Sequence, residues 1–412
     1  MNKIEQLEKE LENTLEKRGR VDVLNKLAVE LRNIDPRRSS AYSQEALGIA
    51  ESIGYKKGKA DSFAQIGFAH IHSAENEKAF ANLLDSLTLY KELDDAPGMG
   101  NALYNLGVLH IRLGVFDQAI ESLHKSLEIR ERLNDRSGMA ACYFQLTYIS
   151  QHFNDLDVAM ENANKSANIR KEMNDNVGLA AAYMVMGEIF LKKRQFDKAE
   201  DILEKSLALR KTSPEKMGYF ATLLRWTELH IEKKHYEKAR GFASEGLQIA
   251  MEENVRFGVM RFMQLIARLE FLSGNTTGAK EQYEKALAYA DQHSYKSIKY
   301  EIYESLYTIY RSEGNFQKAL EQYELFHKLK EEVISLQTNA QLKSVQLMNQ
   351  IEFARKEADI EKNKNAELKK AYSIIEDKNK EIIDSINYAR RIQSALLPGE
   401  KYFERCLKKN KG

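Results

Sequence analysis

The chain has 412 residues, and its 62 lysine and arginine residues balance its 61 aspartate and glutamate residues. This balance provides no strong electrostatic field, so nucleic acid and anionic membrane surfaces are poor candidate partners. Its two cysteines, Cys142 and Cys406, are too few for a disulfide framework and lack the spacing of metal ligands, which favours a reducing, cytoplasmic location.

The N-terminal segment, residues 1–19, is predicted to be a capping helix. Ile4, Leu7, Leu11 and Leu15 form one amphipathic stripe that can cover the end of whatever follows. The segment is charged throughout and lacks the apolar core of a signal peptide. No later window approaches the roughly 18 apolar residues of a membrane span, so we expect a soluble protein.

One stretch, residues 98–135, shows the design of the central region most clearly. Apolar residues recur at helical spacing in 101–112 and again in 116–133, and Gly114 lies at the turn between them. This pattern predicts a helix, a turn and a second helix.

The same design recurs every forty residues. Steps of forty from Ala119 reach an alanine in both directions, and steps from Gly98 reach a glycine from Gly58 to Gly258, before Ile298 breaks the series. A small residue at constant phase inside a helix allows close approach of a neighbouring helix. The alanines are Ala79, Ala119, Ala159, Ala199, Ala239, Ala279 and Ala319.

These residues resemble the tetratricopeptide repeat, in the forty-residue form of bacterial regulators such as the Rap family and of kinesin light chains. The signature residues in this sequence are Leu103, Leu106, Gly107, His110, Gly114, Phe116 and Ala119. The resemblance implies an all-α, right-handed solenoid of about eight helix-turn-helix units over residues 20–335, with a degenerate first unit. A single unit cannot bury its apolar faces alone, so neighbouring units must stack.

In such a solenoid, the first helices of the units form the concave face, where we expect a protein or peptide partner. The side chains expected there are aromatic or polar and carry both signs of charge, which suits a peptide better than a small metabolite. The candidate groove residues are Asn101, Tyr104, Arg112, Phe144, Tyr148, Gln151, His152, Glu188, Lys192, Glu228, Arg261 and Arg268. The Lys and Asn pattern with which some of these repeats grip chaperone tails is not recognisable.

Residues 336–397 are predicted to form a coiled-coil helix that continues the last repeat. Apolar residues alternate at spacings of four and three, as in the heptad repeat of a coiled coil. Asn365 and Asn379 occupy heptad position a, where buried asparagines favour a parallel pair of helices. The predicted dimer seam contains Leu347, Ile351, Asn365, Leu368, Tyr372, Ile375, Asn379, Ile382 and Ile386. A single solvated helix is the alternative, because Glu361 and Gln393 interrupt the seam.

The rest of the sequence offers no catalytic pattern. We expect Pro398 and Gly399 to end the long helix, and residues 398–412 form a short basic tail that is not expected to fold alone. The nine histidines lack paired-ligand spacing, and no phosphate-binding loop or nucleophile motif is present. The sequence therefore predicts no cofactor, no metal site and no enzymatic activity.

The end of the predicted coiled coil carries a second resemblance. The segment KNKEIIDSINYARRIQSALLP, residues 378–398, resembles the helical linker that precedes SpoIIE-type serine/threonine phosphatase domains in bacterial signalling proteins. In that family an acidic, metal-binding GD motif follows the linker, and this chain contains no GD dipeptide. The resemblance therefore implies a sensor and linker without the catalytic domain.

These observations favour a signalling adaptor whose repeats bind a protein or peptide and whose coiled coil dimerises and relays the event to an effector, such as a SpoIIE-type phosphatase. Two alternatives remain open at this point. The chain is the truncated sensory half of such a phosphatase, or it is a Rap-like regulator of a kinase or response regulator.

Overall fold

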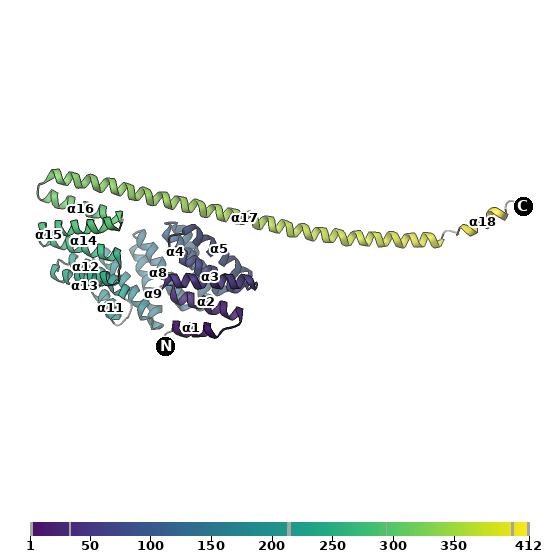
Figure 1. Ribbon diagram of the computed structural model, residues 1–412, viewed down its shortest axis with the longest axis horizontal. Helices are drawn as coiled ribbons and strands as arrows, with labels where there is room; N and C mark the ends of the chain where they lie inside the picture. The colour runs from purple at the N-terminus through teal and green to yellow at the C-terminus, as the bar shows by residue number, and fades with distance from the viewer. Residues whose placement is uncertain (1–2, 33, 212–215, 294, 397–398, 410–412) are drawn as a thin grey trace. The chain divides into compact units, whose positions relative to one another are not determined.

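The computed structural model describes residues 3–32, 34–211, 216–293, 295–396 and 399–409, and every regular element in these ranges is a helix (Figure 1). The helices are α1 (Lys3–Asn13), α2 (Lys17–Leu31), α3 (Pro36–Ser52), α4 (Lys56–His72), α5 (Asn76–Glu92), α6 (Ala96–Arg112), α7 (Phe116–Arg132), α8 (Arg136–His152), α9 (Leu156–Glu172), α10 (Asn176–Lys192), α11 (Phe196–Lys211), α12 (Lys216–Glu232), α13 (Tyr236–Glu252), α14 (Arg256–Leu272), α15 (Thr276–Gln292), α16 (Lys296–Ser312), α17 (Phe316–Leu396) and α18 (Glu400–Lys409).

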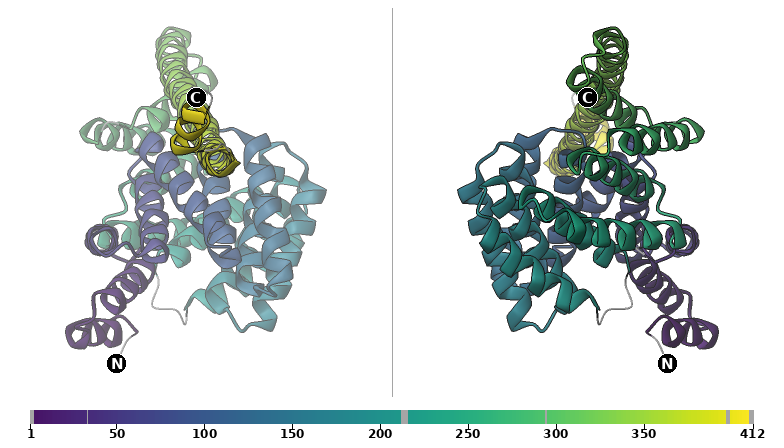
Figure 2. Two further views of the ribbon diagram at one scale, coloured as in Figure 1. Left: turned by 90° about the vertical axis from the view of Figure 1, so that its right-hand side faces the viewer. Right: turned by 90° about the vertical axis from the view of Figure 1, so that its left-hand side faces the viewer.

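Consecutive helices from α2 to the start of α17 pack as antiparallel pairs, and the pairs stack on one another (Figure 2). This confirms the predicted solenoid of helix pairs, which a long helix follows. At the other end of the solenoid, α1 packs on α2 and α3, with Leu7 buried against Val23 and Leu27.

The links between helices repeat every twenty residues with the same backbone geometry. Each described link in this series contains one residue with a left-handed backbone, such as Gly114 at φ +69° and Asn134 at φ +53°. Glycine adopts this conformation without strain, and asparagine tolerates it better than most residues. The aspartates that follow several of these positions cap the next helix; Asp135 and Asp175, for example, each accept the backbone N–H of a glycine three residues later at 2.9 Å.

The alanines and glycines of the forty-residue series lie where helices meet. All seven alanines are buried, with at most 3% of their surface exposed. The glycines are covered by larger side chains: a Cβ added at Gly98 would lie 2.2 Å from the ring of Tyr90, and one at Gly178 would lie 1.8 Å from Arg170. The small residues therefore set how closely neighbouring helices approach, as their fixed phase predicts.

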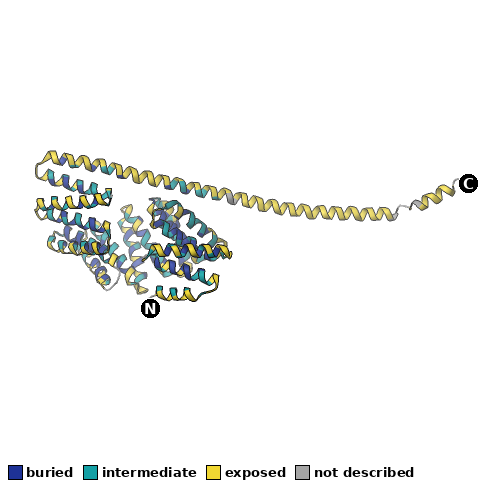
Figure 3. Ribbon diagram, viewed as in Figure 1, coloured by how far each residue is buried: buried dark blue, intermediate teal, exposed yellow. Residues whose placement is uncertain are grey.

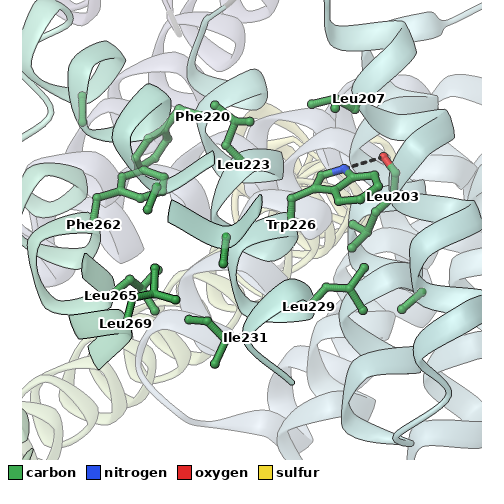
Figure 4. Close-up of a cluster of buried hydrophobic side chains, with 14 of the residues drawn as sticks. Leu203, Leu207, Phe220, Leu223, Trp226, Leu229, Ile231, Phe262, Leu265 and Leu269 are labelled. Carbon is green, nitrogen blue, oxygen red and sulfur yellow. Dashed lines mark hydrogen bonds between the residues drawn. The ribbon is translucent and has the colours of Figure 1, made fainter. Parts of the chain in front are cut away.

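Larger apolar side chains fill the space between the pairs. In the cluster around α12, Trp226 packs between Leu203 and Phe242 and donates its indole N–H to the carbonyl of Leu203 at 3.2 Å (Figure 4). The indole thus buries its apolar surface without leaving its one donor unsatisfied.

The helix α17 belongs to two compact units, Met1–Gln346 and Leu347–Gly412. Within the first unit, the Ser344 hydroxyl lies 3.4 Å from the Glu77 carboxylate on α5, and the Gln341 side chain lies against Gly114. The start of α17 therefore contacts the second and third repeats as well as the last one.

In the second unit, residues 361–394 of α17 are exposed throughout (Figure 3). The predicted tail contains the helix α18, in which Lys408 and Lys409 complement the C-terminal dipole. Residues 401–409 are exposed throughout, so the expectation that this tail does not fold alone stays a prediction. Pro398, the predicted end of the long helix, lies outside the described residues.

The buried alanine series generates a stability prediction. Replacement of Ala159 by leucine adds methyl groups where no space exists, so we expect a loss of about 1–3 kcal/mol in the free energy of unfolding. Chemical denaturation followed by circular dichroism measures this loss. The control is Asn164→Leu on the exposed face of the same helix, which should leave stability nearly unchanged. Equal stability of the two variants would contradict the packing described here.

Candidate functional site

A hollow lies between the first helices of the first four pairs. It has a volume of about 720 Å³ and is lined mainly by residues of α2, α4, α6 and α8. Tyr90 and Arg130 reach it from the second helices α5 and α7. Most of its lining side chains are polar or charged, so their hydrogen bonds decide what the cavity can bind.

Four amide side chains occupy one position of consecutive first helices, forty residues apart, namely Asn25, Gln65, Asn105 and Gln145. The first three line the cavity. Asn25 donates to the carbonyl of Gly58 at 3.2 Å and accepts from the Ser62 hydroxyl at 3.0 Å. Gln145 donates to the Tyr104 hydroxyl at 3.2 Å. The outer members of the series therefore have partners.

The two middle amides differ from the outer ones. Within the described residues, Asn105 makes no hydrogen bond although it is only 6% exposed, and the Gln65 side-chain oxygen is buried without a partner. A buried amide without a partner costs free energy that a bound polar group would recover. These two side chains thus give the cavity unused capacity to donate and accept hydrogen bonds.

A charged cluster forms one wall of the cavity. The Lys57 ammonium lies 2.6 Å from the Asp61 carboxylate and 2.7 Å from that of Asp95, and the Tyr90 hydroxyl donates to Asp61 at 2.7 Å. Burial raises the pKa of the Asp61 carboxyl more than Lys57 and Tyr90 lower it. Burial lowers the pKa of Lys57, but its two carboxylate partners outweigh that effect and raise it overall. The cluster is therefore internally paired.

Arg130 builds the opposite wall. Its guanidinium donates to the Asp135 carboxylate at 2.6 Å, to the Ser126 hydroxyl at 2.9 Å and to the Asn101 side-chain oxygen at 2.9 Å. It also lies 5.6 Å from the ring centre of Tyr104. With so many bonds and only 7% exposure, Arg130 acts as a fixed support that holds Asn101 and Tyr104 at the cavity surface.

The predicted groove residues fall into three places. Asn101 and Tyr104 line the cavity, whereas Arg112, Tyr148 and His152 are exposed beyond it and Phe144 is half-buried. Tyr148 is 56% exposed, and His152 stacks on Phe116 with ring centres 4.2 Å apart.

The remaining predicted residues are tied into contacts between neighbouring first helices. Lys192 donates to Gln151 at 2.9 Å, and Glu188 pairs with Lys192 at 3.3 Å and with Arg225 at 3.1 Å. Glu228 pairs with Arg225 on its own helix, whereas Arg261 pairs with Glu301 and Arg268 with Glu232 on neighbouring first helices. The later repeats thus satisfy their own charges.

Sequence reasoning missed much of the cavity, including Asn25, Gln65, Asn105, Asp61 and Arg130. A forty-residue step from Asn105 would have found the amide series. Steps of forty residues from Arg130 reach Arg170 and Arg210, whereas Asp61 belongs to no such series. Both residues also contact side chains of other helices, Tyr90 and Asn101, which spacing along one helix does not reveal.

In the part of the chain that the structure describes, no group of three or more histidine, cysteine, aspartate or glutamate side chains could hold a metal ion. His110 is buried, with its ring centre 6.1 Å from that of Phe80, as the repeat pattern predicts. None of the described helices combines the length and apolar character that crossing a membrane requires.

Comparison with known proteins identifies the repeats. Residues 98–172 and 182–217 match two family models, both described as tetratricopeptide repeat. The chain contains tetratricopeptide repeats. No curated protein matches it.

Solved structures share this fold at low sequence identity. The apo form of the quorum sensor NprR from B. thuringiensis has 18% sequence identity and a TM-score of 0.63 to this chain. The match covers 79% of this chain and 92% of the NprR chain. A Rap protein complexed with competence and sporulation factor is 13% identical, covers 81% of this chain and 92% of its own, and has a TM-score of 0.60. The apo form of RapI is 16% identical, covers 67% of this chain and 99% of its own, and has a TM-score of 0.57.

Proposed function

We propose that this tetratricopeptide-repeat protein is a peptide-binding regulator. The observation that carries the proposal is the cavity of the first repeats, where Gln65 and Asn105 present amide groups without partners among the described residues. A regulator needs a ligand site and an output, and we assign these roles to the cavity and to α17.

A peptide suits the cavity because each amide side chain can both donate to and accept from a peptide group. Neighbouring packed helices lie about 8–10 Å apart, which equals about three residues of an extended chain. Amides at the same position of successive first helices can therefore hold the backbone at regular intervals. The predicted groove residues Phe144 and Tyr148 lie on the next first helix and can receive side chains of a longer ligand.

Two structures of similar fold add support. The NprR structure in complex with its cognate peptide NprX has a TM-score of 0.51 and 18% identity to this chain. The Rap protein described above was solved with competence and sporulation factor. Both show that this fold can take a ligand, and a peptide ligand for the present chain is our proposal.

Peptide binding is tested with a pool of dye-labelled random heptapeptides and equilibrium dialysis. We expect the double variant Gln65→Ala/Asn105→Ala to retain about thirtyfold less peptide than the natural chain, because two hydrogen bonds of about 1 kcal/mol each are lost. The control is Asn164→Ala, which removes an exposed amide from α9. Thermal unfolding verifies that all variants are folded. Failure to retain peptide, or equal retention by the double variant, would reject the proposal.

We propose further that α17 dimerises through the predicted seam. The seam positions from Asn365 to Ile386 are exposed in the single chain, and Leu347 and Ile351 are partly buried. Leu368, Tyr372, Ile375, Ile382 and Ile386 are each more than half exposed, which is unusual for a row of large apolar side chains. A parallel partner helix would cover this row and pair Asn365 and Asn379 with their counterparts.

Dimerisation is tested by sedimentation of the full chain. Ile375→Asp places a charge in the seam at a d position, and we expect it to convert a dimer into a monomer at tens of micromolar. Ile374→Asp is the matched control, since Ile374 is even more exposed, at 62% against 55%, but lies off the seam. A natural chain that is monomeric, or equal association of both variants, would show that the helix is solvated.

The output is proposed to be an effector of the SpoIIE phosphatase type, on the resemblance of residues 378–398 to the linker of that family. The chain would act in the cytoplasm, with no catalytic role of its own. A regulator of a kinase or response regulator is the second candidate, because the Rap structures share the fold.

The effector proposal predicts that the purified chain changes the rate at which a SpoIIE-type phosphatase from the same genome hydrolyses a phosphoserine peptide. The Ile375→Asp variant should have no effect, because the paired helices would be lost. A rate that the natural chain leaves unchanged would remove the phosphatase as the effector and leave the second candidate.

A further inference from the structure

The charged side chains of the cavity differ in whether they already have a partner. Its three carboxylates are all engaged: Asp22 accepts from the Tyr55 hydroxyl at 2.9 Å, Asp61 is paired with Lys57, and Asp135 is paired with Arg130. Two further cations line the cavity, Lys26 and Arg32, and neither has a carboxylate partner among the described residues. Lys26 and Arg32 are therefore cavity side chains that can pair with an anion without first giving up a carboxylate.

Basic side chains continue along one edge of the solenoid, at the C-terminal ends of the first helices. Steps of forty residues from Arg32 reach His72 and Arg112, at the ends of α4 and α6. The guanidinium of Arg32 lies 4.9 Å from the ring centre of Phe68, and the His72 ring centre lies 4.6 Å from the same ring. Arg112 is exposed and also has no carboxylate partner in the described part of the chain. We call Arg32, His72 and Arg112 the basic edge.

The three side chains of the basic edge influence one another. Burial lowers the pKa of His72, and the positive charges of Arg112 and Arg32 lower it further. The lowered pKa favours the neutral imidazole of His72, so the charges of the basic edge are those of Arg32 and Arg112, and both would attract a bound anion.

The fold does not require a cation at the repeat position that Arg32, His72 and Arg112 occupy. Basic side chains at the end of a helix complement its dipole, which could explain Arg32 or Arg112 alone. However, the same position holds Glu232 at the end of α12 and Leu272 at the end of α14. At the two steps after Arg112, His152 stacks on Phe116 and the Lys192 ammonium is paired with Glu188 at 3.3 Å. In this series, the arginines without a carboxylate partner among the described residues therefore lie at the ends of α2 and α6.

We infer that the ligand of the cavity is an acidic peptide, whose backbone is held by Gln65 and Asn105 and whose carboxylates are bound by Arg32 and Arg112. This inference rests on the proposed peptide-binding function and adds the chemical class of the ligand. Arginine suits the role because its planar guanidinium can donate two parallel hydrogen bonds to one carboxylate. The exposed Lys26 contributes a further positive charge at the α2 end of the cavity.

The test uses three pools of dye-labelled heptapeptides with blocked ends that differ in one respect. The first carries two aspartate or glutamate residues per peptide, the second carries asparagine or glutamine at the same places, and the third carries lysine or arginine there. Equilibrium dialysis with the full chain measures how much of each pool is retained. We expect about tenfold greater retention of the acidic pool than of the amide pool, which corresponds to about 1.4 kcal/mol.

Two sets of variants assign the effect. The double variant Arg32→Gln/Arg112→Gln should retain the acidic pool only as well as the natural chain retains the amide pool. Its retention of the amide pool should be unchanged. The matched control Arg132→Gln removes an exposed charge at the end of α7 and should change neither. Gln65→Ala/Asn105→Ala should reduce retention of both pools.

The outcomes separate this inference from the function on which it rests. Equal or stronger retention of the amide or basic pool, still lost in Gln65→Ala/Asn105→Ala, would overturn the acidic ligand and keep peptide binding. An acidic preference that survives in Arg32→Gln/Arg112→Gln would overturn the assignment to these arginines. Retention of no pool would overturn both the inference and the proposed function.

Discussion

The close approach of neighbouring helices at the buried alanines is the constraint on which the rest of this structure depends. Because Ala119 and its counterparts have almost no exposed surface, each helix pair meets the next at nearly the same place and in the same rotation. Residues that are forty positions apart on successive first helices therefore face the same side of the solenoid. The regular packing turns a periodic sequence into rows of side chains, such as the amides Asn25, Gln65 and Asn105.

Equivalent positions nevertheless differ in what their polar groups do. In the later repeats, Arg225 pairs with Glu188 on the neighbouring first helix and with Glu228 on its own helix. A ligand there would have to replace existing ion pairs and would gain little. Beside the cavity of the first repeats, Gln65 and Asn105 have no partner to give up among the described residues. The two halves of one solenoid thus offer very different free energies to an incoming polar ligand.

The start of α17 departs from the pattern of a simple repeat array. Units of such an array contact only their neighbours, so a disturbance in one unit reaches distant units only step by step. Here Ser344 lies beside Glu77, and Gln341 lies against Gly114, although the whole array separates them in the sequence. Any change in the curvature of the repeats must therefore strain or release these contacts. Within the first unit, these contacts join the second and third repeats to the start of α17.

Periodicity alone determined the helix pairs, their forty-residue repeat and the burial of the alanine series, because spacing along one helix dictates which side chains share a face. It also led to Asn101 and Tyr104, which line the cavity. Only the tertiary structure decided which polar groups remain free. Arg130 is committed to Asp135 and Asn101 whereas Arg32 has no carboxylate partner among the described residues, and a sequence pattern cannot distinguish them, since pairing depends on side chains from different helices. The same reason hid the contact of α17 with the second and third repeats.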